Sequence, residues 1–206
     1  MPGERKRMTR AESQQRTRED VLDAAEDLFL TYGLHGTTVA KIAAAAGRTQ
    51  GAIYANFDSK ENLCAEVLMR CYLRTFAALL GKVAEVGDLS NQQLAPLITW
   101  WKDLIRDESL VTLAAEYALA AQKSPDQLAV SRGYIEMGRN MFGAMVSGAF
   151  PPGTSDAQRE TALNGILATS AGVALGRTFG VLDDDQVGDL LIRAARMWIA
   201  DISPAD

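Results

Sequence analysis

The sequence predicts an all-α fold, and three observations support this prediction. Apolar residues recur at helical spacing through most of the chain. Ser, Thr or Asp residues precede many of these segments and Gly follows several of them, as helix caps and stops do. No segment shows the alternation of apolar and polar residues that a half-buried strand requires, and no internal repeat is evident.

The composition is that of an ordinary globular protein. Hydrophobic residues make up 48% and charged residues 23% of the 206 residues, so the chain can bury a core of its own. No apolar run approaches the roughly 20 residues that span a bilayer, and the amino terminus leads into no apolar signal segment. We therefore expect a cytoplasmic protein with no membrane partner.

The two cysteines, Cys64 and Cys71, are seven residues apart on one predicted helix. The helical rise places them on one face about 10 Å apart, which is too far for a disulfide between them. We expect two buried thiols, as is usual in a reducing compartment.

The distribution of charge singles out the amino terminus. The net charge of the whole chain is -5, yet its first eighteen residues hold six basic and two acidic side chains. Residues 1–16 are therefore predicted to form a basic flexible arm. Such an arm docks on phosphate in some proteins and is a solvated tail in others, and both readings stay open.

Four helices are predicted in the first part of the chain. The first runs over 17–32, where Thr17 and Asp20 have the form of a capping box and Gly33 is placed to stop the helix. The second begins at Thr37 or Thr38, either of which can cap it, and stops at Gly47.

The third helix covers 50–57 with Thr49 as its cap, and the fourth starts after Ser59 and reaches about Leu80. A turn at 87–88 follows. The remaining predicted helices lie at 91–107, 109–122, 125–149, 155–179 and 184–201.

The second and third helices, with the tight turn at Gly47 between them, have the arrangement of a helix-turn-helix. Thr49, Gln50 and Gly51 stand at the start of the third helix, where residues that read the major groove belong, and Gln can make a bidentate contact to adenine. Around them, four side chains are candidate phosphate contacts: Arg48, Thr49, Tyr54 and Lys60. Short helix pairs with a Gly turn also occur in proteins that bind no DNA.

Several motifs in this region together resemble the TetR (tetracycline-repressor-type) family signature. They are FLTYG at 29–33, GTTVAKIA at 36–43, AG at 46–47, GAIY at 51–54 and FDSKENL at 57–63. The resemblance implies a DNA-binding domain at 17–62, a ligand-binding and dimerisation domain at 63–206, and repression relieved by a small molecule.

The resemblance also implies roles for individual residues. Thr38 and Lys41 would lie near phosphate, Thr49, Gln50 and Gly51 would face bases, and a further group would hold the backbone or flanking bases. That group is Tyr54, Asn56 and Lys60, and we add Thr37, the other candidate cap, to the DNA-binding residues. Ala40 and Ala55 are small where some family members carry larger contacting side chains, so base readout is expected to be sparse.

A stripe of small residues on the 155–179 helix and the apolar face of the last helix predict a dimer interface, as the family resemblance also implies. Its predicted residues are Gly165, Ala168, Gly172, Gly176, Leu191, Ala194 and Trp198. The same pattern would arise if the two helices packed within one subunit.

A ligand pocket is implied by the resemblance and is supported by the Met-rich, broadly apolar 125–149 helix. The candidate lining residues are Phe76, Trp100, Trp101, Tyr117, Tyr134, Met137 and Met141, each of which would also serve in a plain core. Glu116 and Glu136 are candidate polar anchors for a ligand or solvated side chains.

No catalytic, cofactor-binding or metal-binding motif stands out. The chain has one histidine, His35, and lacks a phosphate loop, a dinucleotide fingerprint and a nucleophile elbow. Asp183, Asp184 and Asp185 suit a helix amino terminus better than a metal. We therefore expect no enzyme and no cofactor. The expected partners are a double-stranded DNA operator, a small apolar or aromatic effector of unknown identity and a second copy of the chain; a helical adaptor protein is the alternative.

Overall fold

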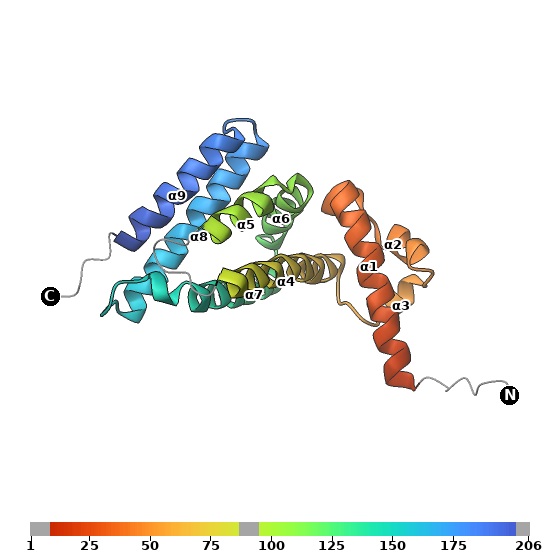
Figure 1. Ribbon diagram of the computed structural model, residues 1–206. Coiled ribbons are helices and arrows are strands. Elements are labelled where there is room, and N and C mark those ends of the chain that lie inside the picture. The colour runs from red at the N-terminus through yellow and green to blue at the C-terminus, as the bar shows by residue number, and fades with distance from the viewer. Residues whose placement is uncertain (1–8, 87–94, 201–206) are drawn as a thin grey trace.

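The computed structural model describes residues 9–86 and 95–200, and every regular element within them is helical (Figure 1). The order is α1 (Arg10–Gly36), α2 (Val39–Ala45), α3 (Gln50–Tyr54), α4 (Lys60–Val86), α5 (Ala95–Arg106), α6 (Glu108–Ala121), α7 (Pro125–Met145), the short 3-10 helix η1 (Ser147–Ala149), α8 (Asp156–Thr178) and α9 (Asp184–Ala200). The all-α prediction is confirmed.

The long helix α4 joins the two ends of the molecule. Helices α1 to α3 lie at one end, α8 and α9 lie at the other, and α4 extends between them (Figure 1). One hydrophobic cluster begins in α1 to α3 and continues through α4 into α6, where it includes Leu113 and Tyr117. A second cluster unites α5, α7, α8 and α9 with Leu79 of α4. The core of the helix-turn-helix end is therefore completed by α6.

Helix α1 begins earlier than its sequence pattern predicts. Thr9 is the cap: its Oγ accepts a hydrogen bond from the Glu12 N–H (3.2 Å), and the Glu12 carboxylate accepts one from the Thr9 N–H (2.7 Å). The Thr17 hydroxyl instead donates to the Ser13 carbonyl inside the helix. The predicted start at Thr17 is wrong because Thr9 has a Glu three residues later, the better capping-box partner. Residues 10–16 are therefore helical rather than part of a flexible arm, and Arg5, Lys6 and Arg7 lie outside the described residues.

Gly33 interrupts α1, as the sequence predicts. Its backbone has φ 72° and ψ 176°, a conformation essentially restricted to glycine. The chain makes one more turn before α2. Gly33 also brings its Cα close to α6, since a Cβ built there would lie 2.7 Å from the Glu116 Oε2. The position needs glycine for its backbone and for the space beside it.

The predicted caps of the next three helices are confirmed. The side-chain oxygens of Thr38, Thr49 and Ser59 accept hydrogen bonds from backbone N–H groups three residues later, at 3.0–3.3 Å. Gly47 in the turn has φ 61°, a conformation that glycine adopts readily because it has no Cβ. Helix α3 ends at Tyr54, sooner than predicted, and α4 continues to Val86, beyond Leu80.

The other boundaries fall close to the sequence prediction. Helix α5 is described from Ala95, and the turn predicted at 87–88 lies outside the described residues. Helix α7 ends at Met145 rather than at 149, where η1 takes over. Both cysteines are free and buried, as expected.

Helices α8 and α9 pack against each other, and the stripe of small residues is divided between two faces. Gly165 lies under the Trp198 indole, where a Cβ would clash with the ring. Leu191 and Ala194 are buried in the second cluster of the same subunit, and Gly176 faces Leu182. The outward face of α8 instead carries two of the predicted interface residues, Ala168 and Gly172, which are exposed.

Replacing Gly33 by alanine is expected to lower the free energy of unfolding by about 2–3 kcal/mol, because alanine is strained at this φ and ψ and its Cβ would crowd Glu116. Chemical denaturation followed by circular dichroism measures this change. Gly81→Ala is the control. Gly81 lies in α4 with open space around it, so alanine there should stabilise the helix by about 0.5–1 kcal/mol. Equal effects of the two substitutions would contradict the role of Gly33.

Candidate nucleic-acid interface and effector cavity

The helix-turn-helix presents a small exposed surface at α3. Gln50, Gly51 and Tyr54 are all exposed on this helix, while Ile53 points inward and is 2% exposed. Thr38 and Thr49 are exposed beside them, with their hydroxyls accepting the cap bonds. A helix of this kind, with polar residues at its amino end, suits insertion into a major groove.

The cations near this surface differ in how freely they can reach a phosphate. Lys41 is exposed and its ammonium lies over the Tyr32 ring, where it also donates to the Gly36 carbonyl (3.0 Å). Arg48 forms an ion pair with Asp20 of α1. Asn56, a neutral member of the predicted set, donates to the Ala52 carbonyl at the end of α3.

Two of the predicted DNA-binding residues make hydrogen bonds within the protein. Thr37 is fully buried, and its hydroxyl donates to the Leu28 carbonyl (3.0 Å), so it cannot reach DNA. The Lys60 ammonium donates to the carbonyls of Leu34 (2.7 Å) and Thr37 (3.1 Å). Lys60 therefore closes the segment between α1 and α2 against the start of α4, a function that the sequence motif does not reveal.

The same segment is bound from the other side by α6. The Glu116 carboxylate accepts a hydrogen bond of 2.6 Å from the Leu34 N–H. Leu34 thus has its N–H held by α6 and its carbonyl held by Lys60 of α4. Glu116 was a candidate ligand anchor from its sequence position; it lies at this joint because Gly33 lets the α1 backbone approach it. We call the Glu116, Leu34 and Lys60 contacts the interdomain joint.

A second polar contact links α7 to the start of α4. The Gln127 amide donates to the Ser59 hydroxyl (3.2 Å) and to the Asn62 side-chain oxygen (2.6 Å). The amide oxygen of Gln127 is buried without a hydrogen-bond partner among the described residues. Helix α6 therefore contacts the segment between α1 and α2, and helix α7 contacts the start of α4.

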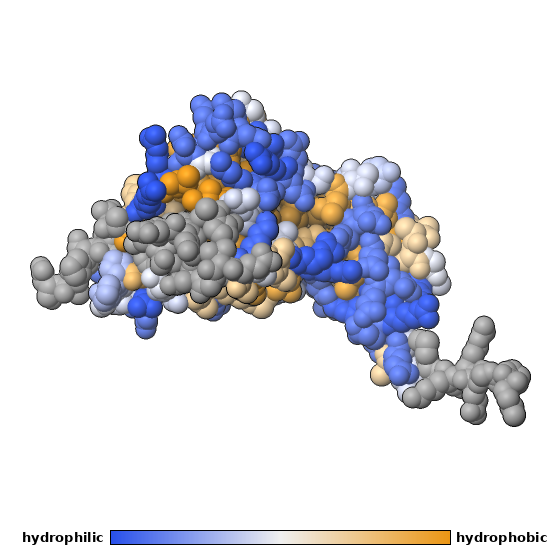
Figure 2. Space-filling model, in the orientation of Figure 1, coloured by the Kyte–Doolittle hydropathy of each residue, from blue (hydrophilic) through white to orange (hydrophobic). Residues whose placement is uncertain are grey.

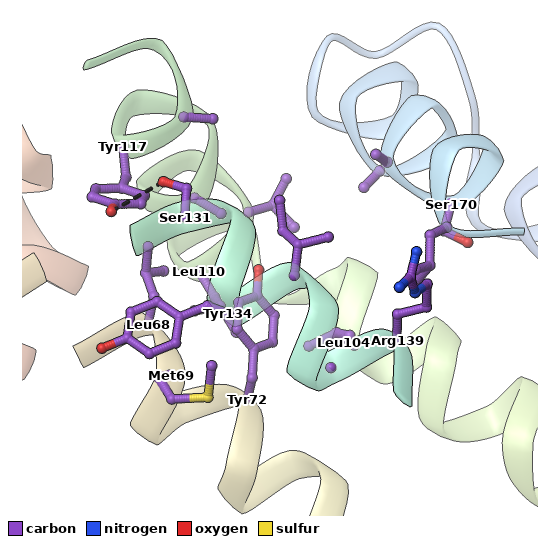
Figure 3. A pocket seen from close by; sticks show the side chains of 18 of the residues that line it. Leu68, Met69, Tyr72, Leu104, Leu110, Tyr117, Ser131, Tyr134, Arg139 and Ser170 are labelled. Atoms are coloured by element: carbon purple, nitrogen blue, oxygen red, sulfur yellow. Dashed lines mark hydrogen bonds between the residues drawn. The ribbon is translucent and has the colours of Figure 1, made fainter. Parts of the chain in front are cut away.

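Helices α4 to α8 line a cavity of about 670 Å³, within the usual range for small-molecule sites. Figure 3 shows Tyr117 and Ser131 together at one end, joined by the hydrogen bond from the Ser131 hydroxyl to the Tyr117 hydroxyl (3.1 Å). Leu68, Met69 and Leu110 lie on the same side as this pair, Tyr72 and Leu104 lie farther along, and Arg139 and Ser170 lie at the other end (Figure 3).

Six of the seven pocket candidates line this cavity: Phe76, Trp100, Trp101, Tyr117, Tyr134 and Met141. Met137 does not, because it lies on the outer face of α7 and is 39% exposed. The sequence reasoning missed Arg139, Tyr72 and Ser170. The mostly apolar pattern of the 125–149 segment gave no reason to place an arginine on the wall of the cavity.

Three cavity tyrosines are held in their neutral form. Burial raises the pKa of Tyr117 and Tyr134, and it raises the pKa of Tyr72 to about 12. Tyr72 is nevertheless 37% exposed, because part of its ring faces the cavity itself. These hydroxyls add hydrogen-bond donors to the wall without adding negative charge.

The described residues contain no cluster of His, Cys, Asp or Glu that could hold a metal ion. Asp183 caps α9 by accepting from the backbone N–H groups of Asp185 and Gln186, and Asp184 pairs with Arg106 and Arg177. Within the same ranges, no helix has the length and apolar character needed to cross a membrane.

Comparison with known proteins points to one family. Residues 21–67 match the model of "Bacterial regulatory proteins, tetR family". The HTH-type transcriptional repressor KstR2 of Rhodococcus jostii is 39% identical over 82 residues, which are 40% of this chain and 40% of that repressor. The matched stretch therefore spans less than half the length of this relative.

Solved structures share the fold over nearly the whole chain. A TetR transcriptional regulator from Rhodococcus sp. RHA1 has a TM-score of 0.65 at 19% identity and covers 91% of this chain and 98% of its own. The regulator FadR from Bacillus subtilis, solved with stearoyl-CoA, has a TM-score of 0.63 at 18% identity, covering 90% and 99%. At these identities the likeness concerns the fold.

Lys60→Met is expected to lower the free energy of unfolding of the DNA-free protein by about 1.5–3 kcal/mol, because it removes charge-assisted hydrogen bonds to two carbonyls. Lys41→Met is the matched control and should cost less than about 1 kcal/mol, since its ammonium is exposed and bonds one carbonyl. Urea denaturation measures both. If Lys60→Met left stability unchanged, Lys60 would have to be regarded as a phosphate contact only.

Proposed function

Since the chain belongs to the TetR family of bacterial regulatory proteins, we propose that it is a dimeric repressor that leaves a palindromic operator when a small apolar molecule fills its cavity. The observation that carries this proposal is the exposed polar start of α3, at Gln50, Gly51 and Tyr54, within the family-matched segment. Such residues read base edges and hold phosphates.

The cavity supports the effector part of the proposal. Five helices line it, and its wall is mostly apolar and aromatic, as the walls of small-molecule sites usually are. FadR, which has the same fold, was solved with stearoyl-CoA. We propose an effector site here and none on the helix-turn-helix surface.

The interdomain joint offers a route from the cavity to the DNA. Tyr117 lines the cavity, and the adjacent residue, Glu116, binds the Leu34 N–H ahead of α2. A ligand that shifts α6 relative to α4 would therefore move the backbone before α2. Such coupling is reciprocal, so the DNA-bound protein must bind the effector more weakly by the factor by which the effector weakens DNA binding. Equal effector affinity of the free and DNA-bound forms would contradict this route.

The outward faces of α8 and α9 are the proposed dimer surface. Large apolar residues are exposed on these two helices and on the connection between them: Leu175, Phe179, Val181, Leu190 and Met197. The small residues Ala168 and Gly172 lie exposed on α8 within the same surface and would let a partner helix approach closely. Figure 2 shows an apolar patch on the α9 side of the molecule. Apolar faces of this kind mark association sites in soluble proteins.

The DNA-binding proposal is tested by selecting duplexes from a random pool with the full-length protein and measuring affinity for the selected site over a range of salt concentrations. The native protein should bind tightly with a steep salt dependence. Gln50→Ala with Tyr54→Ala should weaken specific binding by about thirtyfold or more, since each base contact contributes ~1–3 kcal/mol. Leu119→Ala, exposed on α6, is the control and should bind normally. Failure to enrich any sequence would reject the proposal in favour of the adaptor alternative.

The dimer proposal is tested by analytical ultracentrifugation of Leu175→Asp with Phe179→Asp. Two charges placed in a shared apolar interface should raise the dimer dissociation constant by about a hundredfold or more. Leu119→Asp places the same charge on an exposed leucine outside the proposed surface and should leave the dimer intact. An unchanged dimer in the double variant would remove α8 from the interface.

A further inference from the structure

We propose that the cavity takes an elongated apolar ligand with one anionic end, of the fatty carboxylate type, and that this end pairs with Arg139. The inference rests on the proposed role of the cavity as the effector site and specifies the chemistry of its ligand. It depends on the charges of the wall, on the geometry of Arg139 and on the arrangement of polar groups along the cavity.

The wall of the cavity carries charge of one sign. Among the described residues that line it, Arg139 is the one charged side chain, and none is Asp or Glu. A charge transferred from water to apolar surroundings without a partner is strongly disfavoured. A cationic ligand would therefore find no counter-charge on this wall, whereas an anionic ligand would find one at Arg139.

Arg139 keeps part of its guanidinium available. Its Nη1 donates to the Glu160 carboxylate (2.7 Å) and to the Asn164 side-chain oxygen (3.4 Å). The Glu136 carboxylate lies 4.0 Å from Nη2. Neither Nε nor Nη2 donates a hydrogen bond to a described residue. An edge formed by Nε and Nη2 has the spacing that a carboxylate accepts with both oxygens.

The surroundings of Arg139 leave its charge effective on the cavity side. The side chain of Arg139 is 20% exposed, whereas those of Glu136 and Glu160 are 69% and 57% exposed. Water screens these two carboxylates more than it screens groups within the apolar cavity. The two glutamate carboxylates therefore compete only weakly with an anion in the cavity for the Arg139 guanidinium.

The arrangement of polar groups defines the shape of the ligand. Arg139 and Ser170 lie at one end of the drawn wall and the Tyr117–Ser131 pair at the other, with apolar side chains such as that of Leu104 between them (Figure 3). A hydrocarbon chain that starts at Arg139 would run along this apolar middle toward α6. It would end near Tyr117, which follows Glu116 of the interdomain joint by one residue along α6.

The proposal is tested by calorimetric titration of the full-length protein at neutral pH with decanoate, decanol and decylammonium. These probes have the same chain and differ in the charge of the end group. Decanoate should bind about tenfold or more tightly than decanol, as expected for one charge-assisted contact, and decylammonium should bind most weakly. Equal affinities for decanoate and decanol, or tightest binding of decylammonium, would overturn the proposal.

Three variants assign the preference to Arg139, after circular dichroism has confirmed that they fold. Arg139→Met should abolish the advantage of decanoate over decanol. Glu160→Gln should strengthen decanoate binding, because it removes the carboxylate that now shares the guanidinium. Arg132→Met, exposed on the same helix and absent from the wall, should change nothing. A decanoate preference that survives Arg139→Met would also overturn the proposal.

The outcome is separable from that of the DNA-binding test. Binding of selected DNA together with no binding of any of the three probes would overturn the ligand class and leave the regulator intact. Arg139-dependent binding of decanoate by a protein that selects no DNA would support the ligand class and reject the proposed function.

Discussion

The backbone of Leu34, held at its N–H and at its carbonyl, makes the contacts on which the arrangement of the two ends of the molecule depends. Its N–H is bound by Glu116 of α6 and its carbonyl by Lys60 of α4. Gly33 makes this possible, because only glycine readily adopts its backbone conformation and leaves space for the carboxylate. The helix-turn-helix follows within a few residues, so its orientation is set by two helices that also line the cavity.

Helices α4 and α6 therefore both contribute to the hydrophobic cluster of the helix-turn-helix end and line the cavity. Leu113 of α6 is fully buried in the cluster that stabilises the DNA-binding end, whereas Leu110 and Tyr117 belong to that cluster and also line the cavity. Side chains that are closely packed do not move independently of one another. A ligand that displaces Tyr117 must consequently be accommodated by the same packing that holds α1 against α6. The cavity and the helix-turn-helix are linked by shared side chains as well as by the interdomain joint.

Several site predictions made from the sequence differ from the structure for identifiable reasons. Lys60 fits the pattern of a phosphate contact, but in the structure its ammonium donates hydrogen bonds to the carbonyls of Leu34 and Thr37. Thr37 and Thr38 are chemically alike, and only folding reveals that Thr37 is the buried one. Arg139 was missed because a helix with apolar residues on several faces gives no sign of which face turns inward.

By itself the sequence determined the helices, the turn at Gly47, the caps Thr38, Thr49 and Ser59, and the interruption at Gly33. These features depend on interactions between residues three or four positions apart, which the order of residues specifies directly. Only the tertiary structure decided the partner of Glu116, 82 residues from Leu34, the stacking of Trp198 on Gly165 and the charge of the cavity wall. Those outcomes depend on how whole helices cross, and helical periodicity fixes which residues share a face but not what that face meets.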